Sequence, residues 1–192
     1  MKQALTALIF CTGCLLPLAA SAQVDYFGKA DTLYADIARI NDKQWTVTVS
    51  YSNDEGVVGL SVPLKLNADS TTRILADSAV YTGGRVEDWA YRGFRPDTAI
   101  QAVMLGMIAN LGPTNRLLAP GSGRLVTVFV SSVDDKPIEK LTVDTTTLYP
   151  ANSLLVVADR AELKDENDTV PPHLSKKLEI IPVFVARTEE EE

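Results

Sequence analysis

The most constraining feature of this sequence is a regular alternation of apolar and polar residues in two neighbouring segments. In residues 44–53 (QWTVTVSYSN), apolar side chains occupy every second position from Trp45, and Thr or Ser lies between them. In residues 57–66 (VVGLSVPLKL), the same spacing runs from Val58 to Leu66. Side chains two residues apart lie on the same face of a β-strand, so each segment predicts a strand with one buried face.

A short polar turn, residues 53–56 (NDEG), separates these two segments, which predicts a β-hairpin. Pro63 lacks a backbone N–H, so we expect the second strand at a sheet edge or beside a bulge. Lys65 adds a charge that opposes edge-to-edge pairing. On the same outward side, Gly59 and Ser61 leave a shallow surface that another part of the chain, or a partner, can approach closely.

Seven further segments have strand-like patterns and are bounded by Gly, Pro, Asn and Asp turn signals. They are residues 31–38, 73–81, 99–109, 124–131, 140–146, 153–159 and 178–186. In the one segment that also contains helix formers, Gly106 argues against a helix. About nine strands at this spacing predict an all-β chain that forms a single β-sandwich or jelly roll.

The first 22 residues have the features of a cleaved secretory signal peptide. Lys2 precedes an almost wholly apolar run over residues 4–20, and residues 20–22 (ASA) match an A-x-A cleavage site. Cys14 would suit a lipid anchor, but the apolar run continues past it to the A-x-A site. We therefore expect cleavage after Ala22 rather than lipidation.

Cleavage at this point leaves a mature chain without cysteine, because Cys11 and Cys14 both lie in the signal. We expect one domain at residues 23–188, which relies on its core without disulfides, and an acidic tail at residues 189–192. The full chain has a net charge of −7, which argues against nucleic acid as a partner. The expected location is secreted, cell-surface or periplasmic, with no transmembrane span in the mature chain.

Trp89, Tyr91 and Phe94 lie close together in residues 83–96, which we interpret as a long connection between strands. Planar rings of this kind can stack on a sugar, so these three residues are candidates for binding a polysaccharide or a partner protein. The alternative interpretation is that the rings are there for their buried area and cover one end of the sandwich.

The sequence contains one candidate metal site and no catalytic signature. Asp165, Asn167 and Asp168 lie together in one loop, and hard oxygen ligands of this kind suit calcium. A solvated acidic loop without a metal is the alternative. The single histidine, His173, cannot form a zinc site without cysteines, and neither a nucleophile elbow nor a phosphate-binding loop occurs. We therefore expect a protein that is not an enzyme and that needs no cofactor other than this calcium.

Several segments together resemble a cohesin-like domain, the β-sandwich related to bacterial carbohydrate-binding modules. They are VGLSVPLKL (58–66), DSAVYTGGRVEDW (77–89), VMLGMIANLG (103–112), PGSGRLVTVFV (120–130) and VDTTTLYPANSLLVV (143–157). The resemblance covers nearly all of the mature chain. Its motifs are structural patterns, so it implies the fold and does not identify partner-contacting residues.

The resemblance implies a secreted, non-catalytic binding or adhesion module that engages another protein. Cohesins bind dockerins, which carry paired calcium loops, through one sheet face. This chain has a single copy of the domain, whereas scaffold proteins carry several, so the resemblance does not specify a dockerin-like partner. Two other functions stay open: a carbohydrate-binding module that uses Trp89, Tyr91 and Phe94, and a purely structural domain of the cell envelope.

Overall fold

The computed structural model describes residues 25–69, 72–111, 116–150, 152–163 and 178–188. These residues form eleven strands and one short 3-10 turn, which confirms the predicted all-β class. The elements are β1 (Thr32–Asn41), β2 (Gln44–Asn53), β3 (Val57–Ala68), β4 (Ile74–Val80), β5 (Tyr91–Asp97), β6 (Ala102–Ile108), β7 (Gly121–Ser132), β8 (Leu141–Thr145), β9 (Leu155–Ala158), η1 (Arg160–Leu163), β10 (Glu179–Ile180) and β11 (Val183–Thr188).

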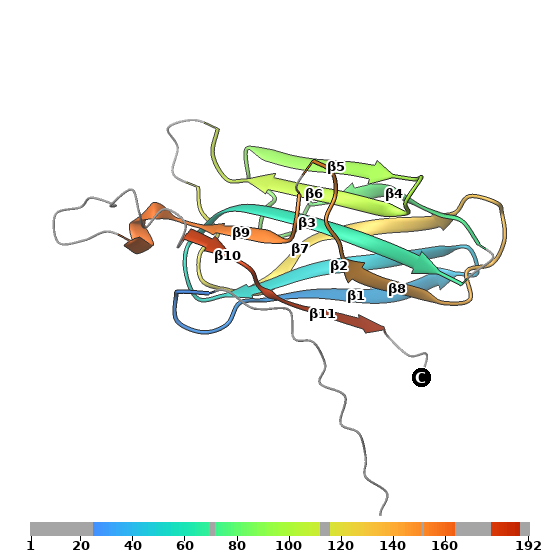
Figure 1. The fold of residues 1–192 in the computed structure, drawn as a ribbon, viewed down its shortest axis with the longest axis horizontal. Helices are drawn as coiled ribbons and strands as arrows, with labels where there is room; N and C mark the ends of the chain where they lie inside the picture. The colour runs from blue at the N-terminus through green and yellow to red at the C-terminus, as the bar shows by residue number, and fades with distance from the viewer. Residues whose placement is uncertain (1–24, 70–71, 112–115, 151, 164–177, 189–192) are drawn as a thin grey trace, which may run out of the picture.

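The strands form two sheets that pack around a shared core as a β-sandwich (Figure 1). One sheet has the order β11-β1-β2-β7-β4 and the other has the order β10-β9-β3-β6-β5, with β8 also paired to β3. In the view of Figure 1, β5 and β6 run side by side at the top and β1 and β11 at the bottom. The β1–β11 pair is parallel, and the other described pairs are antiparallel.

The core is made of the inward side chains that alternation predicts. Trp45 is 6% exposed, and the other apolar side chains of β2 are fully buried beside it. The indole Nε1 of Trp45 donates a hydrogen bond to the carbonyl oxygen of Ile138 at 3.2 Å, which satisfies its one polar atom. From the opposite sheet, Leu60, Val62, Leu64 and Leu66 enter the same core. The predicted inward faces of both segments are therefore confirmed.

The predicted hairpin between residues 44–53 and 57–66 is wrong. β2 pairs with β1 and β7, whereas β3 pairs with β6, β8 and β9 in the other sheet. The turn at residues 54–56 therefore carries the chain from one sheet to the other. Alternation defines which side of a strand is buried, but it does not choose the strand that shares its hydrogen bonds.

The expected edge position of Pro63 is also wrong, because β3 is a central strand. Pro63 lies opposite Met104 of β6, and its carbonyl accepts a hydrogen bond from the backbone N of Thr146 at 3.3 Å. The N and O atoms of one residue in an antiparallel strand point toward the same neighbour. The position where Pro63 lacks an N–H therefore faces the side of β3 that pairs with β9 before this residue and with β8 after it. The hydrogen bonds between β3 and β6 lose no donor.

Strand β5 lies in the segment that the sequence predicted as a connection. Gly93 and Pro96 interrupt its pattern, and β6 is its ladder partner, so β5 is an edge strand that tolerates a proline. The preceding residues cover one end of the sandwich, with Val86 and Trp89 buried in the core. Arg85 ties this segment to β2, because its Nη1 donates to the carbonyl of Tyr51 at 2.9 Å.

The described residues contain no helix long and apolar enough to cross a membrane. The predicted signal peptide at residues 1–22 and the acidic tail at residues 189–192 lie outside the described residues. Both remain predictions.

Candidate binding face

The outward face of the sheet that contains β9, β3, β6 and β5 is built from cross-strand rows of side chains. The strand registers define two full rows, Val157–Gly59–Ile108–Tyr91 and Leu155–Ser61–Gly106–Gly93, and a third row, Pro63–Met104–Arg95, in which Pro63 is buried. We call the ten residues of these rows other than Pro63 the β3–β6 face. The residues between them in each strand, such as Leu60 and Leu105, point into the core.

The middle row gives this face a shallow floor. Its residues across β3, β6 and β5 are Ser61, Gly106 and Gly93, so the longest side chain at these positions is that of serine. Taller apolar side chains border the floor, among them Tyr91, which is 48% exposed, and Ile108, which is 41% exposed. Together with Met104, Leu155 and Val157 they form an open groove of about 260 Å³.

Tyr91 lies along its own strand and over the floor. A Cβ atom at Gly93 would overlap the phenol ring, and a Cβ at Gly106 would lie 3.6 Å from Cε1 of the same ring. The glycine at position 93 is therefore what lets the ring lie against the sheet. A ring in this position shields the backbone of glycines that would otherwise be exposed on a strand.

Tyr81 holds β5 from the side of the core. Its hydroxyl donates a hydrogen bond to the carbonyl oxygen of Gly93 at 2.8 Å, and the side chain packs against the core cluster. Burial raises the pKa of Tyr81 to about 12, so the phenol keeps its proton and remains a donor. This contact fixes the position of the edge strand that carries Tyr91.

Charged residues lie at the rim of the β3–β6 face. Glu179 of β10 is the cross-strand neighbour of Val157 at one edge, and Arg95 of β5 lies at the other edge. Both are exposed. An apolar centre with a charged rim is the composition of a typical protein–protein interface.

The outward face of the other sheet is polar along its central strand β2, whereas its other strands also carry apolar side chains there, such as Phe129, Val80 and Val185. Its β2 residues are Thr46, Thr48 and Ser50, and Thr48 Oγ1 lies 3.4 Å from Thr127 Oγ1 of β7. Arg187 and Asp36 form an ion pair across β11 and β1 at 2.5 Å. In the described part of the chain, the centre of this face is therefore polar, whereas the centre of the β3–β6 face is an apolar groove.

The structure places the three candidate aromatic residues in different environments. Tyr91 lies on the β3–β6 face, whereas Trp89 is 4% exposed and belongs to the core. Phe94 lies opposite Leu105 in the β5–β6 register, and it packs against the core from the inner side of β5. The three rings therefore do not share one surface.

The other candidate site of the sequence, the calcium loop with Asp165, Asn167 and Asp168, lies outside the described residues. The sequence did indicate the shallow face of Gly59 and Ser61. It missed Met104, Ile108 and the β9 residues, because their place beside Ser61 depends on strand pairing. The alternation in residues 103–108 was the available signal, since it sends Met104, Gly106 and Ile108 to one side.

No family model and no curated protein matches the sequence. Solved structures do match its fold. A chain of the Coh-OlpA–Doc918 complex, a type I cohesin–dockerin complex from Clostridium thermocellum, matches with a TM-score of 0.54 and 12% identity, over 84% of this chain and 99% of that chain. The chain has the cohesin fold. The third cohesin of ScaC from Acetivibrio cellulolyticus, solved in complex with the ScaB dockerin, matches with a TM-score of 0.49 and 11% identity, over 83% and 99% of the two chains.

On this cohesin fold, the connection between β8 and β9 borders the β3–β6 face, because Ser61 Oγ donates a hydrogen bond to the carbonyl oxygen of Ser153 at 2.9 Å and Asn152 lines the same groove. The face offers a small-residue floor, flexible and aromatic side chains at its border, and charges at its rim. Such a surface can exclude water from an apolar contact without any catalytic group.

Proposed function

We propose that this chain is an exported, non-catalytic binding module that docks another protein on its β3–β6 face. The contrast between the centres of the two sheet faces carries the proposal: Thr and Ser line the central strand β2 of one sheet, and an apolar groove lies at the centre of the other. The cohesin fold supports a protein partner, because the matching structure from Clostridium thermocellum is that of a cohesin–dockerin complex.

The groove indicates the chemistry of the partner surface. The small residues Gly106 and Ser61 leave space for an aliphatic side chain beside the Tyr91 ring, and Met104 can adapt its shape to the incoming group. Tyr91 supplies a large amphipathic ring of the kind that dominates binding energy at interfaces. Arg95 and Glu179 at opposite edges favour a partner with complementary charges on either side of an apolar ridge.

A sugar ligand would use this face differently. Stacking on a polysaccharide requires several exposed rings in one plane, whereas Tyr91 is the one candidate ring that lies on the face. We therefore propose Tyr91 as a partner-contacting residue. Binding to a polysaccharide, or a purely structural role without a ligand, would contradict the proposal.

The deciding experiment compares two matched variants as bait for proteins of the producing cell's envelope and secretome. Gly106→Arg places a long charged side chain on the floor, and the new Cβ meets the Tyr91 ring at an ordinary contact distance of 3.6 Å. Thr48→Arg makes a similar change at the polar centre of the other sheet's outward face. Circular dichroism establishes that both variants are folded.

We expect the wild type and Thr48→Arg to capture the same protein, and Gly106→Arg to lose it. Calorimetry with that purified protein should then show at least about a tenfold loss of affinity for Gly106→Arg, which is about 1.4 kcal/mol. Equal capture by Gly106→Arg would exclude this face as the docking site. Retention on insoluble polysaccharide with no protein partner would favour the sugar-binding alternative.

Export is tested separately, because it depends on residues 1–22. We expect the protein outside the cytoplasm to begin at Gln23, as sequencing of its N-terminus would show. A lipid-modified chain beginning at Cys14, or a chain that keeps Met1 in the cytoplasm, would contradict the predicted cleavage.

A further inference from the structure

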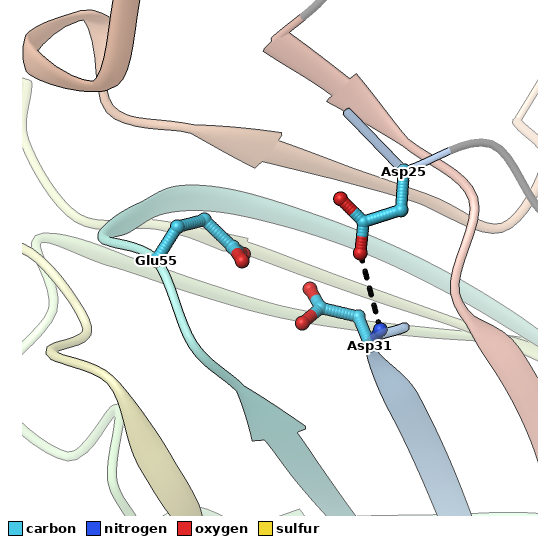
Figure 2. Close-up of side chains that lie close together, drawn as sticks. All are labelled: Asp25, Asp31 and Glu55. Carbon is cyan, nitrogen blue, oxygen red and sulfur yellow. Dashed lines mark hydrogen bonds between the residues drawn. The ribbon is translucent and has the colours of Figure 1, made fainter. Parts of the chain in front are cut away.

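Three carboxylates converge at one end of the sandwich, where the segment before β1 meets the turn between β2 and β3 (Figure 2). Asp31 directly precedes β1, Glu55 lies in the turn, and Asp25 comes from the start of the described chain. One carboxylate oxygen of each residue lies within 4.8 Å of the others. Asp31 is 1% exposed and Glu55 is 3% exposed, so this is a buried cluster and not a solvated acidic patch.

The surrounding protein does not neutralise these two buried carboxylates. Within the described residues, no group donates a hydrogen bond to Oδ1 of Asp31 or to either carboxylate oxygen of Glu55. The ion pairs of the described chain likewise involve other acidic residues. Burial, reinforced by the neighbouring carboxylates, raises the pKa of Asp31 well above its ordinary value, and burial also raises the pKa of Glu55.

The remaining atoms of the cluster are held in place by hydrogen bonds. The Tyr51 hydroxyl donates to Oδ2 of Asp31, which leaves Oδ1 as the free oxygen of that group. Asp25 accepts from the backbone N of Phe27 at 2.9 Å and from the backbone N of Asp31 at 3.2 Å. The unpartnered oxygens of Asp31 and Glu55 therefore face the space between the three residues, as Figure 2 shows.

The two backbone segments that carry the cluster are also fastened to each other. Oδ2 of Asp54 accepts a hydrogen bond from the backbone N of Lys29 at 2.7 Å. Gly28 has a φ of 47°, and a Cβ there would overlap the Asp54 carboxylate. Asn53 donates to the carbonyl oxygen of Glu55 at 2.6 Å and so fixes the turn. These contacts position the carboxylates before any ligand arrives.

We propose that Asp25, Asp31 and Glu55 form a divalent-cation site that takes Ca²⁺. Two oxygens bound to one Ca²⁺ at about 2.3–2.6 Å cannot lie more than about 5 Å apart, and the three carboxylates meet this limit. A set of hard oxygen donors without His or Cys suits calcium and does not suit zinc. The two free oxygens of Glu55 can bind in a bidentate manner, and carbonyls or water can complete a coordination of six to eight.

The proposed ion has a structural role. It compensates the buried negative charge and ties residues 25–31 to the turn that carries the chain from one sheet to the other. The site uses none of the residues of the predicted calcium loop, and it does not depend on the proposed docking function.

The experiment measures thermal unfolding and calorimetric binding of the purified protein after removal of metals with a chelator. The probes are CaCl₂ and MgCl₂, each added alone at millimolar concentration. We expect calcium to raise the Tm and to bind with one-to-one stoichiometry, with a smaller response to magnesium, which demands a strict octahedral geometry. Glu55→Gln should weaken calcium binding at least about tenfold and remove the shift in Tm.

Two control variants separate this site from other acidic groups. Glu139→Gln makes the same chemical change at an exposed position and should keep the full calcium response. Asp165→Asn with Asp168→Asn removes the carboxylates of the predicted calcium loop and should also keep it. Loss of the response in the latter variant would assign the ion to that loop and overturn the proposal.

The chelated proteins provide a second readout. Without calcium, Glu55→Gln should have a higher Tm than the wild type, because the change removes a buried carboxylate that nothing compensates. If Glu55→Gln fails to fold, Asp25→Asn, at a half-buried position, takes its place and should weaken calcium binding. A wild-type Tm that calcium leaves unchanged would show that the carboxylates share a proton and bind no ion. Equal shifts in Tm with calcium and magnesium would overturn the assignment to calcium.

Discussion

The phenol ring of Tyr91 lies over Gly93, two residues further along the same edge strand, so closely that a Cβ at position 93 would overlap the ring. Gly93 is not among the glycines with a positive φ. The ring, and not the backbone, therefore requires glycine at this position. This relationship holds Tyr91 against the β3–β6 face, over the floor formed by Ser61, Gly106 and Gly93.

The effect of Gly93→Ala on stability should change sign with the residue at position 91. In the wild type we expect destabilisation, because the new methyl group displaces the Tyr91 ring. In a Tyr91→Ala background we expect stabilisation by about 0.4–1 kcal/mol, since alanine restricts the unfolded chain. Urea unfolding of the four proteins gives the double-mutant cycle. The same effect in both backgrounds would show that the ring and the glycine are not coupled.

Trp45→Ala should reduce the free energy of unfolding by about 3–5 kcal/mol, as large-to-small changes in a core do. The side chain is buried in the shared core, and its Nε1 is bonded to Ile138. Trp45→Phe keeps most of the apolar volume and should lose less. Denaturant unfolding measures both changes. A loss below about 1 kcal/mol for Trp45→Ala, the range of surface changes, would contradict the buried position.

Pro63→Val combined with Lys65→Val should leave the protein monomeric. β3 already has ladder partners on both sides, so a valine at position 63 exposes no new edge to another chain. The matched comparison is Pro96→Val with Arg95→Val on the edge strand β5, which removes a proline and a charge that discourage pairing. Sedimentation velocity should detect self-association in the β5 variant alone. Dimers of the β3 variant would mean that this strand opens in solution.

Tyr81 should make stability depend on pH in the alkaline range. Its pKa is raised by burial from 10.0 to about 12, so the folded state keeps a proton that the unfolded state releases near pH 10. The contribution is present below about pH 10 and is lost as pH rises toward about 12. We expect the free energy of unfolding to fall more steeply between these values in the wild type than in Tyr81→Phe. If urea unfolding shows that the free energy of unfolding falls equally with pH in the two proteins, burial of Tyr81 has no part in the pH dependence.

Much of the fold follows from local pattern. The bounds of β2 coincide with the predicted segment, and Trp45 to Tyr51 point inward as alternation requires. The shallow outward side of β3, with Gly59 and Ser61, was also readable. These features depend on the two-residue period of a strand, which is set by the backbone of that strand alone.

Other features were not readable because they depend on distant parts of the chain. The predicted hairpin failed because the turn after β2 leads into the other sheet. β5 was missed because Gly93 and Pro96 interrupt its alternation of apolar and polar residues. Its strand conformation depends on its pairing with β6. The aromatic residues at 89, 91 and 94 looked equivalent in sequence, yet Trp89 lies in the core and Tyr91 on the surface.

The sequence by itself determined that this chain is built from strands and which side of β2 and β3 is buried. The tertiary structure decided which strands are neighbours. Strand pairing brings Ser61, Gly106 and Gly93 together in one floor, and the packing of the two sheets brings Asp31 and Glu55 together in one buried cluster. The physical reason is that backbone N–H and C=O groups are alike in every strand, so the ladder has no preference for one partner over another. The choice is made by the packing of two whole sheets around one core, to which segments far apart in the sequence contribute together.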